Sequence, residues 1–72
     1  MGYCVKIRLK DLINEKGITQ KRLAEMAGLR ETTISEIARG ARTAINYKHL
    51  EKIATALNIS DIRKIIYLEK KN

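Results

Sequence analysis

Gln20 to Gly40 read QKRLAEMAGLRETTISEIARG, a stretch that predicts two short helices joined by a tight turn. The first helix, residues 20–27, repeats small and apolar residues on one face at helical spacing, namely Leu23, Ala24 and Ala27. Gly28 follows at once, and glycine adopts the left-handed backbone that ends a helix at little cost. We expect the second helix at residues 30–39, and the rest of the chain to support this pair.

The second predicted helix separates apolar from polar residues. Ile34 and Ile37 point inward, and the small residue Ala24 allows the two helices to cross closely. At about 100° per residue, the opposite side carries residues that form hydrogen bonds: Thr32, Ser35, Glu36 and Arg39. An exposed polar helix face of this width fits the major groove of DNA.

The chain resembles the Cro/lambda-repressor-like helix-turn-helix regulators, also called the XRE family. The resemblance extends from about Leu9 to Ile66 and rests on TQKRLAEMAGL, on TTIS followed by the Arg39-Gly40 pair, and on HLEKIATALNI. It implies an all-α fold, the compact five-helix lambda-repressor-like DNA-binding domain, with the helix-turn-helix at residues 19–40. The composition agrees, because 44% of the residues are hydrophobic but only 4% are aromatic, which favours an aliphatic, helical core.

Apolar spacing predicts supporting helices at about residues 7–16, 47–57 and 60–67 of a single domain that spans residues 1–72. Gly17 follows the first of them. Asn46 is the expected N-cap of the second, and Asn58 ends it. Ser60 and Asp61 open the third.

The two ends of the chain allow a second arrangement. Tyr3, Val5 and Ile7 alternate with polar residues at the period of a strand. Residues 65–69 are then extended and pair with residues 3–7 as a small two-stranded antiparallel sheet, in place of the end of the fifth helix. In either arrangement we expect residues 69–72 to be mobile.

The resemblance also implies which side chains meet DNA. Glu31, Thr32, Ser35 and Glu36 would read base edges. Phosphates would be contacted by Gln20, Lys21, Arg30, Thr33, Arg39, Arg42, Asn46, Tyr47 and Lys48. Four of these residues have an alternative interpretation. Glu31 also suits the positive end of a helix dipole, and Glu36 has the same choice between a structural and a base-reading role, with added phosphate repulsion. Gln20 also suits an exposed helix position, and Tyr47 is equally compatible with partial burial in the core.

Three positions depart from the family pattern. Arg30 stands where many members have a capping serine, and its charge is then available for a phosphate. Glu31 replaces an arginine or glutamine, and it can accept a hydrogen bond from a cytosine amino group. An acidic residue that pairs with a base in the first helix is replaced by Ala38 and Ile13, which predicts apolar packing there.

The charge and the reactive residues restrict the function. Fifteen Lys and Arg against eight Asp and Glu give a net charge of +7, which favours a polyanionic partner. Cys4 has no second cysteine to pair with, and Cys4 and His49 are too few ligands for a metal site. We expect no catalytic residue, cofactor or small-molecule ligand, and no secretory or membrane segment, and we expect the protein to be cytoplasmic.

The sequence therefore predicts a small transcriptional regulator, with repression as the commoner outcome, that binds double-stranded DNA sequence-specifically as a homodimer. Two copies are expected because one short helix touches few base pairs. The alternative is an antitoxin-like or other protein-interaction module on the same fold. The interaction module would bind its partner through surplus apolar residues near the C-terminus: Ile62, Ile65, Ile66 and Leu68. In the regulator, some of these residues would form the dimer contact instead.

Overall fold

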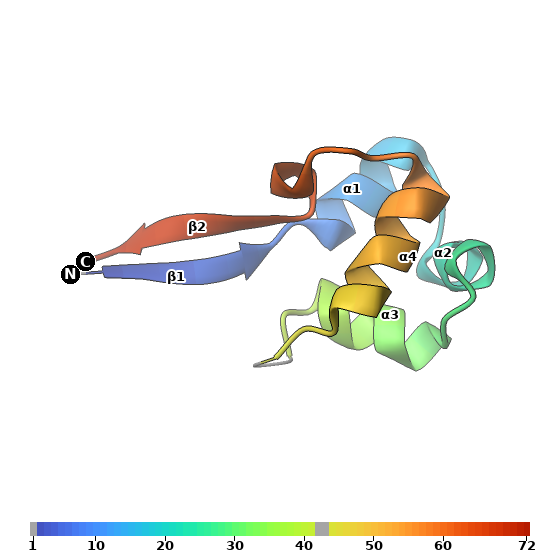
Figure 1. Ribbon diagram of the computed structural model, residues 1–72, viewed down its shortest axis with the longest axis horizontal. Helices are drawn as coiled ribbons and strands as arrows, with labels where there is room; N and C mark the ends of the chain where they lie inside the picture. Colours follow the sequence, from blue (N-terminus) through green and yellow to red (C-terminus); the bar gives the residue numbers. More distant parts are fainter. Residues whose placement is uncertain (1, 42–43) are drawn as a thin grey trace.

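The computed structural model describes residues 2–41 and 44–72, which form a small helical body with a projecting two-stranded ribbon (Figure 1). The elements in chain order are β1 (Gly2–Ile7), α1 (Leu9–Lys16), α2 (Gln20–Ala27), α3 (Glu31–Ala38), α4 (Tyr47–Leu57), a 3-10 turn (Ile62–Lys64) and β2 (Ile66–Lys71). The chain measures 39 × 20 × 19 Å along its principal axes. The ribbon lies along the longest axis, and both ends of the described chain lie at its tip (Figure 1).

The turn between α2 and α3 is formed by Gly28. Its φ of 69° lies in the left-handed region that favours glycine, as the sequence predicts. The backbone N–H of Leu29 donates a hydrogen bond of 3.0 Å to the carbonyl oxygen of Ala24, which completes the end of α2. At the other end of α2, the hydroxyl of Thr19 accepts from the N–H of Arg22 at 3.0 Å. Local residues alone therefore define where α2 begins and ends.

The core lies between the four helices and the 3-10 turn, and its side chains are aliphatic. Its most deeply buried members are Leu9, Leu23, Ile34, Ile53 and Ile65, each at most 1% exposed. Burial of each contributes roughly 1.5–3 kcal/mol relative to exposure. Ala38 and Ile13 both belong to this core, in agreement with the apolar packing predicted at these two positions.

The predicted fifth helix is wrong. The described residues form four α-helices, and residues 60–67 contain only a short 3-10 turn before β2 begins at Ile66. Asp61 opens this turn by accepting a 3.0 Å hydrogen bond from the N–H of Arg63. The β-branched residues that follow lose side-chain freedom in a helix but fit a strand, and β2 satisfies its backbone groups by pairing with β1.

The alternative two-stranded sheet is confirmed. β1 and β2 pair antiparallel over their full length, with Ile7 opposite Ile66 and Gly2 opposite Lys71. The strand continues beyond the predicted end at Glu69, so the expectation that residues 69–72 form a mobile end is wrong for the residues up to Lys71. Because β1 extends through Ile7, α1 begins at Leu9 rather than at Ile7.

Candidate nucleic-acid interface

Helix α3 turns its polar side away from the body. Ile34, Ile37 and Ala38 are buried against the core. Of the residues predicted to read base edges, Glu31 and Thr32 are exposed, whereas Ser35 and Glu36 are half-buried, as is Thr33. The predicted readers therefore share one helix, with the most accessible side chains in its first turn.

The start of α3 has an arginine in place of a capping side chain. Arg30 has an extended backbone (φ −75°, ψ 147°), and no capping hydrogen bond from its side chain is found within the described structure. Its side chain is exposed. A guanidinium beside the positive end of a helix adds to the attraction for a phosphate.

The start of α2 supplies two further predicted phosphate contacts, Gln20 and Lys21. Lys21 is exposed and Gln20 is half-buried. Thr19 caps this helix through Arg22, so the first turn, with its backbone N–H groups directed outward along the helix axis, is well defined. A helix start of this kind attracts an anion.

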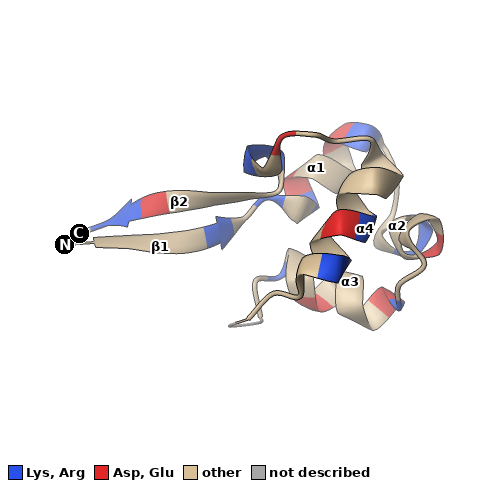
Figure 2. Cartoon of the chain, viewed as in Figure 1, with Lys and Arg blue, Asp and Glu red and all other residues tan. Residues whose placement is uncertain are grey.

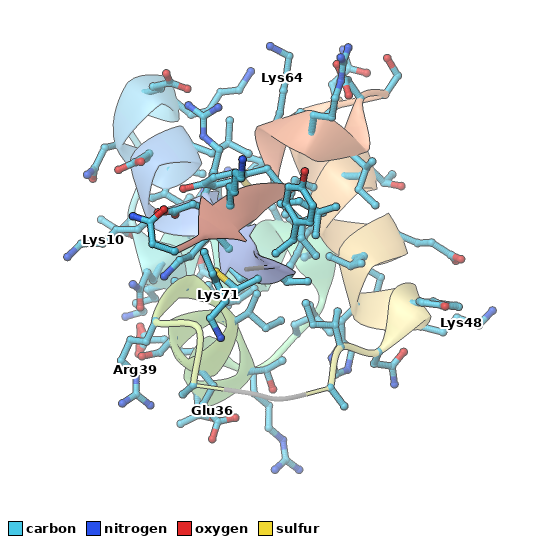
Figure 3. The ribbon with its side chains drawn as sticks, turned by 90° about the vertical axis from the view of Figure 1, so that its left-hand side faces the viewer. Lys10, Glu36, Arg39, Lys48, Lys64 and Lys71 are labelled. Carbon is cyan, nitrogen blue, oxygen red and sulfur yellow. The ribbon has the colours of Figure 1, made fainter. Side chains whose placement is uncertain are left out.

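Asn46, Tyr47 and Lys48 lie together at the start of α4. The side-chain oxygen of Asn46 accepts from the N–H of Lys48 at 2.7 Å, as expected of an N-cap, so only the amide NH₂ group of Asn46 has the polarity to meet a phosphate. Tyr47 is 80% exposed, and the alternative of burial in the core is therefore wrong. Lys48 points into solvent from the start of α4 (Figure 3).

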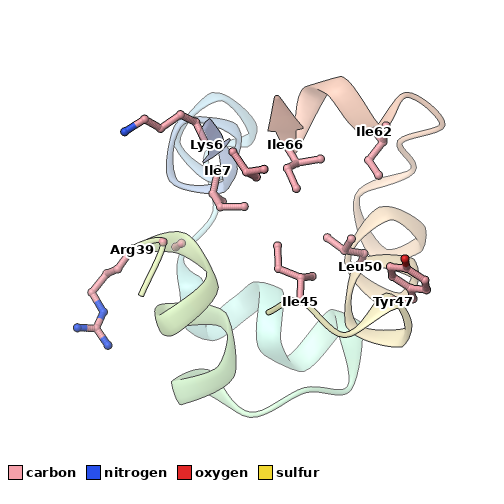
Figure 4. A pocket seen from close by; sticks show the side chains of 11 residues that line it. Lys6, Ile7, Arg39, Ile45, Tyr47, Leu50, Ile62 and Ile66 are labelled. Carbon is pink, nitrogen blue, oxygen red and sulfur yellow. The ribbon is translucent and has the colours of Figure 1, made fainter. Parts of the chain in front are cut away.

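Arg39 directly follows α3 and is exposed, and its guanidinium points outward (Figure 4). The predicted contact at Arg42 lies outside the described residues. Figure 2 shows Lys and Arg at the start of α4 and Asp and Glu on α3, so the electrostatic surface is mixed. Acidic side chains oppose the approach of phosphate groups, whereas a carboxylate can accept a hydrogen bond from a base amino group.

One hollow was not predicted from the sequence. An open cleft of about 560 Å³ lies between the base of the ribbon and the ends of α3 and α4. Ile7 and Ile66 point into it from the ribbon, and Ile45 and Leu50 from below (Figure 4). The strand-like alternation of residues 3–7 is the sequence signal that indicates this apolar side.

Among residues 2–41 and 44–72, no cluster of three or more His, Cys, Asp or Glu side chains has the arrangement to hold a metal ion. Nor does any helix of the described chain have the length and apolar character to cross a membrane.

Comparison of the chain with known protein families agrees with the helix-turn-helix geometry. A family model described as HTH_3, helix-turn-helix, matches residues 9–62, which is most of the chain. Neither the curated proteins nor the solved structures contain a significant match. The matched range begins at the first residue of α1 and ends at the 3-10 turn, so it covers all four helices and leaves out the ribbon. The chain belongs to the XRE-type helix-turn-helix family of DNA-binding proteins, which the Cro and lambda repressors typify.

Proposed function

We propose that this chain is a sequence-specific transcriptional regulator that binds double-stranded DNA by placing α3 in the major groove. The observation that carries the proposal is the exposed polar side of α3, held against α2 by Ile34 and Ile37 and oriented by the turn at Gly28. A major groove about 12 Å wide accepts a helix presented in this way.

The base-reading roles follow from side-chain chemistry. Thr32 donates or accepts a hydrogen bond, or packs its methyl group against thymine. Glu31 accepts from a cytosine amino group, which is the base-edge contact that suits a carboxylate. Ser35 and Glu36 are less accessible and contact bases only when α3 is fully inserted.

The phosphate contacts orient α3 in the groove. Arg30 and Arg39 lie at the two ends of α3, and Lys48 projects from the start of α4. Phosphate contacts strengthen binding to every sequence and carry no base information, so these cations set affinity and α3 sets preference. Lys21, Gln20, Thr33, Asn46 and Tyr47 complete the proposed set, and Arg42 joins it on the family resemblance alone.

We further propose that the regulator acts in the cytoplasm, as a homodimer on a pseudo-palindromic operator, and that it represses by occupying the site. One eight-residue helix reads few base pairs. A second copy on the adjacent half-site adds affinity because its binding becomes intramolecular.

The direct test is selection of bound duplexes from a random DNA pool, followed by affinity measurements against salt. We expect the selected duplex to bind roughly 10³-fold or more tightly than a scrambled duplex at physiological salt. Both affinities should fall steeply as the salt concentration rises. A palindromic winner is the expected result, and equal affinity for selected and scrambled duplexes would reject sequence-specific regulation.

A second candidate function is a protein-interaction module, such as an antitoxin. The exposed apolar residues of the ribbon favour it, since Tyr3 and Leu68 are 67% and 66% exposed. Copurification from the native host separates the two candidate functions. A stoichiometric protein partner, together with equal affinity for selected and scrambled duplexes, would favour the protein-interaction module.

A further inference from the structure

The ribbon formed by β1 and β2 has two unlike faces. In an antiparallel pair, directly opposed residues lie on the same side of the sheet. One side, which we call the inner face, therefore carries Tyr3, Val5, Ile7, Ile66, Leu68 and Lys70. The other side, the outer face, carries Gly2, Cys4, Lys6, Tyr67, Glu69 and Lys71. The inner face is apolar for its whole length except at its tip.

Much of this apolar face is exposed to solvent. Tyr3, Val5 and Leu68 are 67%, 59% and 66% exposed, whereas Ile7 and Ile66 at the base are half-buried. A two-stranded ribbon of this length is marginally stable alone in water, and its stability normally depends on packing against another element. The half of the inner face nearer the tip packs against no other element of the described chain, because the ribbon projects beyond the helical body (Figure 1).

The inner face continues into the cleft below its base, whose lining is mostly aliphatic but also includes Lys6 and Arg39. Ile7 and Ile66 belong to both, and the cleft is completed by Ile45 and Leu50 from the helical body (Figure 4). The ribbon thus has a protruding aromatic side chain, Tyr3, at its tip and a hollow of about 560 Å³ at its base. A knob at one end and a hole at the other complement each other when two such ribbons lie antiparallel.

We propose that the inner face is a homodimer interface, in which the ribbons of two copies pack face to face and antiparallel about a two-fold axis. Val5 and Leu68 lie directly opposite each other near the middle of the ribbon, so they meet their own counterparts near the axis. Tyr3 of each copy enters the cleft of the other. The inference rests on the proposed function only in that it identifies where the proposed homodimer forms.

The distribution of charge selects a second copy as the partner. Two chains with a net charge of +7 repel each other, and this repulsion is smallest when they meet through a surface that brings few charges close together. Within the two strands, the inner face has Lys70 as its one charged residue, whereas the outer face holds Lys6, Glu69 and Lys71. An acidic partner would be attracted to the outer face instead.

The length of the ribbon suits a dimer on DNA. Six residues at about 3.3 Å each make a ribbon about 20 Å long, which is roughly half of the 39 Å long axis. Full antiparallel overlap then places the two helical bodies roughly 40 Å apart, close to the 34–36 Å between half-sites one DNA turn apart. A ribbon of two strands buries less than the roughly 800 Å² per partner of a standard interface, so we expect a dimer that dissociates on dilution.

Sedimentation velocity over a concentration series tests the interface. We expect the wild-type chain to change from 8.2 kDa to twice that mass as its concentration rises. Leu68→Lys puts a charge into the centre of the inner face and should raise the dissociation constant at least about tenfold. The matched control, Glu69→Gln, raises the net charge by the same one unit at the adjacent, exposed residue of the outer face and should dimerise like wild type. Circular dichroism checks that both variants are folded.

A covalent test does not depend on the variants' affinities. Facing residues of two stacked sheets lie about 10 Å apart, so a bismaleimide with a spacer of about that length is the suitable cross-linker. In a Cys4→Ser background, it should link Val5→Cys into a covalent dimer, whereas Lys6→Cys on the outer face should stay monomeric. A wild-type chain that is monomeric at every concentration, Leu68→Lys that dimerises like wild type, or equal cross-linking of both cysteine variants would each overturn the interface.

DNA binding separates this proposal from the proposed function. Leu68→Lys leaves α3 intact, so it should bind a duplex with one half-site like wild type but lose the additional affinity for the palindrome. A chain that dimerises through the inner face and binds no duplex would support the interface and reject the regulator. A chain that binds the half-site but never dimerises would support the DNA-binding function and reject the interface.

Discussion

The backbone N–H of Arg8 donates a 2.7 Å hydrogen bond to the carbonyl oxygen of Ile65. This bond connects the two ends of the chain at the point where the ribbon meets the helical body. Ile65 is only 1% exposed, so its side chain belongs to the core while its carbonyl continues the pairing of the strands. Ile65 thus connects the ribbon to the helical body through both its side chain and its backbone.

Replacing Ile65 by Ala should lower the free energy of unfolding by about 2–4 kcal/mol, because it leaves a cavity beside the core. Ile62→Ala is the control, since Ile62 is 57% exposed and should change stability by no more than about 0.5 kcal/mol. Urea unfolding followed by circular dichroism measures both. Equal losses at the two positions would contradict the assignment of Ile65 to the core.

Gly28→Ala should destabilise the protein by about 1–2 kcal/mol, because a side chain at φ 69° is strained. The cost is backbone strain rather than a clash, since no described atom outside the immediate chain neighbours lies within 4 Å of the added Cβ. Asparagine tolerates the left-handed region better than alanine, so Gly28→Asn should recover part of the loss. Thermal unfolding distinguishes the two variants, and an alanine variant as stable as wild type would refute the strain.

Arg30→Ser should have opposite effects on stability and DNA binding. Serine caps α3 and should stabilise the fold by about 0.5–1 kcal/mol. Loss of the guanidinium should weaken binding to all duplexes alike and reduce the salt slope by about one. Calorimetric melting and fluorescence anisotropy measure the two effects. If affinity for DNA and its salt slope stay at wild-type values, Arg30 contacts no phosphate.

Thr32→Ala and Arg39→Ala should separate base reading from phosphate binding. The first should change the preferred base at one operator position by about 1–3 kcal/mol of discrimination, whereas the second should weaken every duplex equally. Repeating the duplex selection with each variant provides the measurement. An unchanged preference profile for Thr32→Ala would remove it from the reading set.

Asp61 should make stability depend on pH in acid. Hydrogen bonds from Arg63, with side-chain distances of 3.0 to 3.3 Å, lower the pKa of the Asp61 carboxyl below its ordinary value of 3.8. A lowered folded-state pKa stabilises the fold above pH 3.8, and this contribution is lost as the pH falls through the lowered value. The Asp61→Asn variant should therefore be less stable than wild type near neutral pH, and the two free energies of unfolding should converge in strong acid. A stability difference that persists unchanged in acid would contradict this origin.

Local chemistry accounts for the elements that the sequence predicted well. Gly28, Thr19 and Asn46 act through their own backbone geometry and nearby amides, and each has the predicted position in the structure. The helix period of residues 20–27 and 47–57 depends on neighbours three and four residues away, so it is readable without the fold.

The sequence by itself determined the helix-turn-helix and the polar side of α3, because these depend on short-range spacing and on single capping or turning residues. Only the tertiary structure decided the C-terminal segment, where Ile65 and Ile66 fit a helix or a strand equally well until β1 supplies the partner that satisfies β2. Pairing between the two ends of the chain is a long-range interaction, and its cost and gain are not visible in local periodicity. The same pairing created the inner face, which no segment of the sequence contains alone.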